Sequence, residues 1–206
     1  MKPTSYITIN KQSETLLIEK KSRFIGHALP VTTEEEALSF INSMRSRYYD
    51  ASHNVYAYVI SENNIARFSD DGEPGGTAGM PVMEVLKKEG ITDAVVVVTR
   101  YFGGTLLGAG GLVRAYSRSA KQALDGAEIA ERVYCCGMSM STGYENLGKL
   151  RYLIEKGGYI LDDIKYEDNI TISAYVRHDL ADKFIREVTE ATNGAVEVIR
   201  DKEMYV

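Results

Sequence analysis

The alternation of apolar and polar residues is clearest in the last third of the chain. Residues 159–166 and 170–176 alternate apolar and polar side chains, which is typical of strands that bury one face, and the Glu-Asp-Asn stretch at 167–169 indicates a turn between them. The complete predicted order is a strand at 133–140, a helix at 144–156, strands at 159–166 and 170–176, a helix that opens at His178 and a strand at 195–206. This βαββαβ order is typical of a ferredoxin-like domain.

The first two thirds of the chain predict a separate α/β domain. Thr33, followed by three glutamates and then by apolar residues at helical spacing, predicts the start of a helix. The predicted strands cover 15–19, 24–29, 55–60 and 94–99, and two further helices cover 81–88 and about 110–124. We therefore expect a two-domain α/β (α+β) protein, with an N-terminal α/β domain at 1–128 and the ferredoxin-like domain at 132–206.

Composition excludes several classes of protein. Hydrophobic residues make up 44% and charged residues 26% of the 206 positions, as in globular domains. The formal net charge of -5 argues against a polybasic protein that binds nucleic acid by bulk charge, so any such contact must use a local patch. No apolar run is long enough for a spanning helix and no signal peptide is recognisable, so we expect a cytoplasmic protein without membrane contact.

The two cysteines, Cys135 and Cys136, are adjacent in a predicted strand. Neighbouring strand residues point to opposite faces, which suits neither a disulfide nor a zinc site. We expect buried, inert thiols, with a redox sensor as the alternative. His27 and His178 are scattered along the sequence, so no metal site is predicted.

A loop at residues 67–79 combines three acids with four glycines. Asp70, Asp71 and Glu73 could hold a divalent ion, form a partner-binding surface or simply shape a turn. His53 stands before a predicted strand, and no nucleophile motif accompanies it, so a structural hydrogen bond is the expected role. We group His53, Asp70, Asp71 and Glu73 as a candidate partner loop.

A second glycine-rich segment, residues 100–111, lies between a predicted buried strand and a helix. It lacks the lysine of a P-loop and the third glycine of a dinucleotide fingerprint, which argues against a Walker ATPase and a Rossmann oxidoreductase. A glycine-rich turn that opens a helix still offers backbone N–H groups to an anion, and the helix carries three cations on one stripe. The candidate phosphate-binding or nucleic-acid-binding residues are Arg100, Gly103, Gly104, Gly108, Gly110, Arg114, Arg118 and Lys121. A solvated structural stripe is the alternative, and Arg100 could instead pair with the acidic loop.

Several motifs together resemble the IMPACT family, in particular its bacterial YigZ-like branch. The motifs are KSRFI at 21–25, HNVYAY at 53–58, DDGEPGGTAG at 70–79 and VVTRYFGG at 97–104, continuing through Leu107-Gly108 to Ala115-Tyr116. The resemblance extends to the C-terminal ferredoxin-like unit. It implies an N-terminal domain like domain IV of elongation factor G and a second domain like domain V of that factor.

The resemblance also implies a link to RNA or the ribosome. The resemblance implies that eukaryotic relatives regulate translation initiation by competing for the activator of a kinase that phosphorylates an initiation factor. They do so partly through an RWD domain that this chain lacks, so we do not extend that kinase pathway to it. The resemblance implies no catalytic residue, so we assign none, and we expect no cofactor.

Our leading hypothesis is a non-enzymatic cytoplasmic protein that binds structured RNA or the ribosome and modulates translation. One alternative is a nucleotide-dependent and magnesium-dependent phosphate-handling enzyme that uses the acidic loop. Another is a module that binds a protein partner. Nothing in the sequence indicates recognition of DNA in particular.

Overall fold

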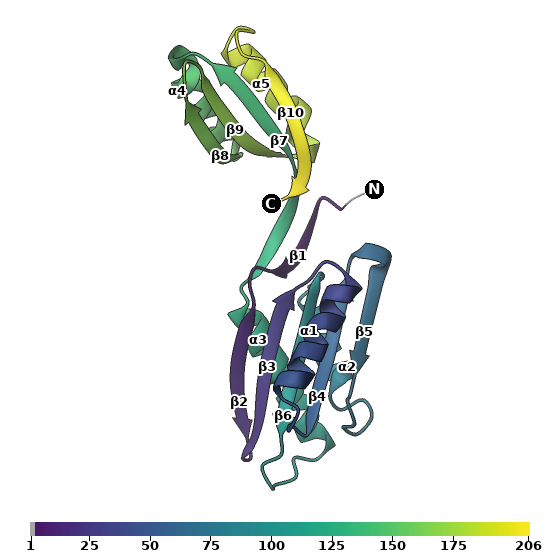
Figure 1. Cartoon of the computed structure of the whole chain (residues 1–206). Helices are drawn as coiled ribbons and strands as arrows, with labels where there is room; N and C mark the ends of the chain where they lie inside the picture. Colours follow the sequence, from purple (N-terminus) through teal and green to yellow (C-terminus); the bar gives the residue numbers. More distant parts are fainter. Residues whose placement is uncertain (1–2) are drawn as a thin grey trace. The chain divides into compact units, whose positions relative to one another are not determined.

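The computed structural model describes residues 3–206, and these residues form two compact units (Figure 1). One unit is Tyr6–Glu131, and the other combines Arg132–Val206 with the described residues 3–5. The start of the chain joins the second unit because the Thr4 carbonyl accepts a hydrogen bond from Tyr134 N at 2.9 Å. This assignment of the first residues differs from the sequence-based ranges, 1–128 and 132–206. Whether each unit folds alone stays a prediction.

The N-terminal unit is built on an antiparallel sheet of five strands in the order β2-β3-β6-β4-β5. The strands are β2 (Ser13–Glu19), β3 (Ser22–Pro30), β4 (His53–Ile60), β5 (Ile65–Ser69) and β6 (Ala94–Tyr101); the helices are α1 (Glu34–Arg47), α2 (Gly79–Lys88), α3 (Ala109–Gly126) and the short 3-10 helix η1 (Glu62–Asn64). Strand β5 and the strand β1 (Ser5–Ile9) were not predicted from the sequence, and each is only five residues long.

Helices cover both faces of this sheet, as Figure 1 shows for α1 on the near side. Val96 and Val98 of β6 pack into a core shared with α2 and α3, whereas Val95 and Val97 pack with α1. The uninterrupted aliphatic run of β6 therefore reflects a strand that is buried on both faces.

The C-terminal unit has the predicted βαββαβ order. Its elements are β7 (Ile129–Thr142), which starts before the division, α4 (Tyr144–Gly157), β8 (Ile160–Tyr166), β9 (Ile170–Arg177), the 3-10 helix η2 (His178–Leu180), α5 (Ala181–Ala191) and β10 (Val198–Tyr205). The strands β8-β9-β7-β10 pair in that order, all antiparallel, and β1 is also hydrogen-bonded to β7. Helices α4 and α5 pack into a core with the alternating buried residues of β9. The predicted two-domain α/β (α+β) fold with a ferredoxin-like C-terminal part is thus confirmed. Among the described residues, no helix combines the length and apolarity that crossing a membrane requires.

Candidate functional site

Exposed basic residues gather where the β2–β3 hairpin approaches the start of α3. A cavity of about 220 Å³ opens there. Its lining consists of Glu19, Lys20, Leu107, Gly111, Arg114, Ala115 and Arg118. Three cations against one carboxylate make this cavity a candidate anion site, which we call the hairpin–α3 site. Lys20 was absent from the sequence-based candidates, although a Lys-Lys pair at a hairpin turn was a usable signal.

Local backbone geometry holds the hairpin against the glycine-rich loop. Lys20 and Lys21 both have positive φ, 45° and 67°, as in the tight two-residue turns that suit the twist of a hairpin. A Cβ on Gly103 would lie 2.0 Å from the carbonyl carbon of Lys21, so only glycine permits this approach. The Gly103 N–H also donates to Ser22 Oγ at 3.1 Å. The loop after β6 is thereby anchored to the hairpin that carries Lys20.

The same loop leads into an open helix N-terminus. Gly104 and Gly108 have φ of 79° and 71°, and Gly108 is the N-cap of α3, where none of the described side chains caps the helix. A Cβ on Gly110 would be 3.7 Å from an Arg114 guanidinium nitrogen, so that guanidinium lies beside the first turn. The positive end of the helix dipole and the Arg114 charge therefore act at the same place.

The other two basic residues of the predicted stripe have carboxylate partners. Arg118 lies 3.5 Å from Glu19 Oε2, and both side chains are well exposed. Lys121 contacts Asp125 at 2.5 Å and Glu89 at 3.4 Å, and the hydrogen bond to Asp125 raises the pKa of its ammonium. Lys121 does not line the cavity, so the structure gives it a role in pairing helices rather than in the hairpin–α3 site.

Arg100 lies apart from these residues because its side chain is buried. Its guanidinium lies 2.6 Å from Glu73 Oε1, which also accepts a hydrogen bond from the Tyr116 hydroxyl at 2.7 Å. Its side chain is 7% and that of Glu73 3% exposed, and the Arg100 guanidinium also stacks over the ring of Phe24. The expectation that Arg100 contacts phosphate at the surface is therefore replaced by the alternative, in which it anchors the acidic loop.

The Glu73 carboxylate is the centre of this buried cluster. Burial, followed by the hydrogen bond to Glu73, raises the pKa of the Tyr116 hydroxyl above its usual range. His53 Nε2 is 3.8 Å from the second Glu73 oxygen, and His53 Nδ1 is 2.8 Å from the Asp71 carbonyl oxygen. His53 thus connects the acidic loop to β4 through these two contacts.

The other acids of the loop are also engaged in shaping it. The Asp70 carboxylate accepts hydrogen bonds from the backbone N–H groups of Gly76, Ala78 and Gly79, at 2.9, 3.1 and 2.7 Å, and so holds the start of α2. The Asp71 carboxylate accepts from Asn54 N at 2.6 Å and lies 3.1 Å from Arg45. These contacts already occupy much of the hydrogen-bonding capacity of the two carboxylates. The prediction that the three acids shape a turn accounts directly for these hydrogen bonds.

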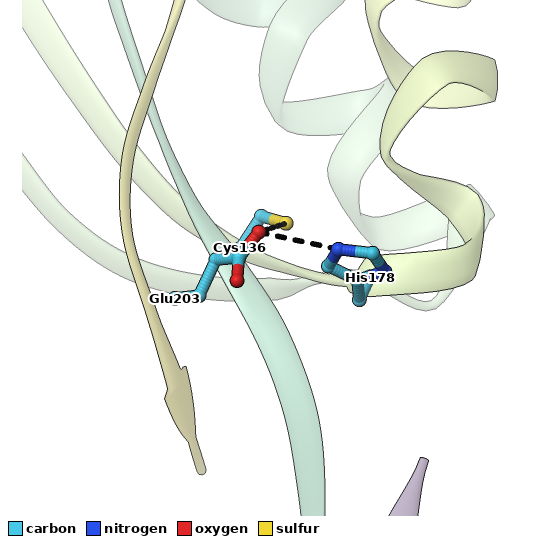
Figure 2. A group of neighbouring side chains, drawn as sticks. All are labelled: Cys136, His178 and Glu203. Carbon is cyan, nitrogen blue, oxygen red and sulfur yellow. Dashed lines mark hydrogen bonds and ion pairs between the residues drawn. The ribbon is translucent and has the colours of Figure 1, made fainter. Parts of the chain in front are cut away.

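A second cluster of chemically capable side chains lies in the C-terminal unit (Figure 2). Of the His, Cys, Asp and Glu side chains in residues 3–206, one group of three places its metal-ligating atoms within 4.8 Å of one another: Cys136, His178 and Glu203. The scattered histidines predicted no metal site, and the sequence pattern could not show this group, because only the folding of β7, β9 and β10 brings the three residues together.

Both cysteines are buried and neither forms a disulfide. Burial, and then the nearby Glu203 carboxylate, raises the pKa of the Cys136 thiol. This shift is opposite to that of a reactive redox-sensor thiol and favours the expected inert state of the free thiol.

Comparisons with known proteins identify both parts of the chain. Residues 20–124 match the family described as the Impact N-terminal domain, and residues 141–195 match a domain of unknown function (DUF1949). The chain is 41% identical over 203 residues to the IMPACT family member YvyE of Bacillus subtilis (strain 168), covering 98% of this chain and 94% of YvyE. It is 29% identical to the IMPACT family member YigZ of Escherichia coli (strain K12), covering 89% and 92% of the two chains.

A solved structure has a similar fold. It is described as "Crystal structure of an hypothetical protein", and its sequence is 27% identical to this chain. The TM-score is 0.61, and the match covers 97% of this chain and 98% of the other chain. The similarity therefore extends across both units.

Proposed function

Because this chain belongs to the IMPACT family, as its two domain matches and its 41% identity to YvyE show, we propose that it is a cytoplasmic, non-enzymatic protein that binds structured RNA or the ribosome and modulates translation. The hairpin–α3 site provides the phosphate contacts. The C-terminal ferredoxin-like unit supplies a second surface. This proposal retains the link to RNA that the family resemblance implies.

The observation that carries the proposal is the convergence of Lys20, Arg114 and Arg118 on one cavity beside the open N-terminus of α3. Arginine offers a planar fork of donors that matches a phosphate, and the first turn of a helix adds backbone N–H groups and a positive dipole. A net charge of -5 would repel RNA from the molecule as a whole, so binding depends on this local patch.

Glu19 is the built-in competitor of an incoming phosphate. Its carboxylate lies 3.5 Å from Arg118 in the same cavity, and the pair is solvent-exposed and therefore weak. A phosphate group can displace it at a cost of less than about 1 kcal/mol.

We expect Arg114→Glu combined with Arg118→Glu to abolish most binding while leaving the melting temperature nearly unchanged, since exposed charges contribute little to stability. Binding is measured by co-sedimentation with ribosomes and by titration of a structured RNA at two or more salt concentrations. The slope of log affinity against log salt should flatten by about one unit for each lost phosphate contact. Glu19→Gln, which removes the competing carboxylate, should instead strengthen binding.

The matched control is Lys87→Glu combined with Lys88→Glu. Both lysines are exposed at the end of α2, and this variant changes the net charge equally. If both double variants lose affinity alike, bulk charge rather than the hairpin–α3 site explains binding. Unchanged binding of the arginine variant would reject the proposal, and a magnesium-dependent melting shift with nucleotide would favour the enzymatic alternative.

A further inference from the structure

Three side chains from separate elements of the C-terminal unit point toward one another in Figure 2, with their donor atoms facing a common space. We propose that Cys136 Sγ, His178 Nε2 and Glu203 Oε1 bind a zinc ion. This inference is independent of the proposed RNA binding, because it concerns different residues in the other unit.

The backbone places all three residues in fixed register. Cys136 on β7 is directly opposite Glu203 on β10, next to an irregularity between Arg200 and Glu203 that bends the strand. Cys136 also pairs with Val176 of β9, and His178 follows only two residues later, at the start of η2. The site therefore connects β7, β10 and the junction between β9 and α5.

Two of the three distances between donor atoms are close to those of a tetrahedral zinc site, and all three are within 4.8 Å. His178 Nε2 is 3.2 Å and Cys136 Sγ is 4.0 Å from Glu203 Oε1. Tetrahedral zinc with ordinary bond lengths separates its donor atoms by about 3.4 to 3.6 Å. The His178 and Glu203 side chains are 53% and 47% exposed, so small rotations of these two side chains bring the donor atoms to such distances.

The chemistry of the donors selects the ion. A thiolate and a carboxylate together balance the charge of a divalent cation, and the neutral imidazole completes a set of sulfur, nitrogen and oxygen donors that suits zinc rather than magnesium or calcium. On binding, the Cys136 thiol releases its proton to solvent as the sulfur–zinc bond forms. With three protein ligands, the fourth position takes a water molecule.

Tyr134 supports two of the three ligands from the outside. Its hydroxyl donates a hydrogen bond to Glu203 Oε2, the carboxylate oxygen not assigned to zinc. Its ring stacks on the His178 ring, with centroids 5.3 Å apart and planes at 22°. Such outer contacts orient the residues that bind a metal ion. Their loss typically lowers the affinity for the metal by about tenfold or more.

The test titrates the metal-free full-length chain with Co²⁺ and then Zn²⁺. We expect a thiolate-to-cobalt charge-transfer band, its displacement by one equivalent of zinc, and a higher melting temperature with zinc but not with magnesium. Cys136→Ser should remove the band. Cys135→Ser, the adjacent buried cysteine, is the matched control and should keep it.

Two variants of exposed ligands keep the test decisive if Cys136→Ser does not fold. His178→Gln and Glu203→Gln should each weaken zinc binding at least about tenfold, and Tyr134→Phe should weaken it by about tenfold. The proposal is overturned if the parent shows no cobalt–thiolate band and no melting shift with zinc. It is equally overturned if Cys135→Ser loses the band, or if neither His178→Gln nor Glu203→Gln changes the affinity.

Discussion

At the scale of single residues, burial decides what each charged side chain can do. Arg100 and Arg114 are both arginines near the same glycine-rich loop, but one is buried against Glu73 and the other lines an open cavity. A buried charge needs a partner of opposite sign, because the loss of hydration would otherwise cost several kcal/mol. The Arg100–Glu73 pair therefore belongs to the fold, while Arg114 is available to a ligand.

We expect Glu73→Gln to lower the free energy of unfolding by about 3 to 5 kcal/mol, because it leaves the Arg100 guanidinium buried without an anion. Chemical denaturation measures the effect. The double variant Glu73→Gln with Arg100→Met should recover part of the loss, since it removes the unpaired charge. Arg118→Gln is the exposed control and should cost less than about 1 kcal/mol. A Glu73→Gln variant as stable as the parent would show that the buried pair contributes nothing.

At the scale of elements, local signals and long-range packing specify different segments. The α1 start follows from a capping box, in which Thr33 Oγ1 accepts from Glu36 N at 3.2 Å and the Glu36 carboxylate accepts from Thr33 N at 3.3 Å. The turn after β6 follows from packing instead, because its glycines are needed where the chain passes the β2–β3 hairpin.

Three alanine substitutions separate the reasons for glycine in these loops. Gly103→Ala should be the most destabilising, because its Cβ meets the Lys21 backbone, which cannot move aside. Gly104→Ala has open space around it but a φ of 79°, so backbone strain alone should cost about 1 to 2 kcal/mol. Gly75→Ala has neither a close neighbour nor a positive φ and serves as the control.

Urea denaturation of the three variants measures their free energies of unfolding and so gives the order of their stabilities. Equal stability of Gly103→Ala and Gly75→Ala would contradict the close packing of the loop on the hairpin. A Gly104→Ala variant as stable as the parent would show that the turn relaxes to a negative φ.

At the scale of the whole molecule, the chain forms two units with separate cores. The C-terminal core includes Met138, Met140, Leu150, Ile154, Ile172 and Phe184, all almost completely buried. None of the residues of this cluster comes from Tyr6–Glu131. Units with their own cores are expected to fold independently.

We expect a fragment of residues 132–206 to unfold in a single cooperative transition, because its core is complete without the rest of the chain. Calorimetry and amide dispersion in NMR spectra measure this. The fragment lacks the Thr4 carbonyl that accepts a hydrogen bond from Tyr134 N, so it should melt somewhat below the same unit in the full-length chain. A fragment without a cooperative transition would contradict the independence of the unit.

Sequence periodicity was sufficient to predict most helices and strands and the ferredoxin-like order, because apolar spacing, capping residues and turn residues act over a few neighbouring positions. The glycine-rich turn and the basic stripe of α3 were visible for the same reason. Only the tertiary structure decided that Arg100 is buried while Arg114 and Arg118 are open, since burial depends on contacts between residues far apart in the sequence, such as Arg100 with Glu73, 27 positions away. It also brought Cys136 and Glu203 together across 67 residues. No local pattern records which distant residues will be neighbours, because that is determined by strand register and by the packing of whole elements.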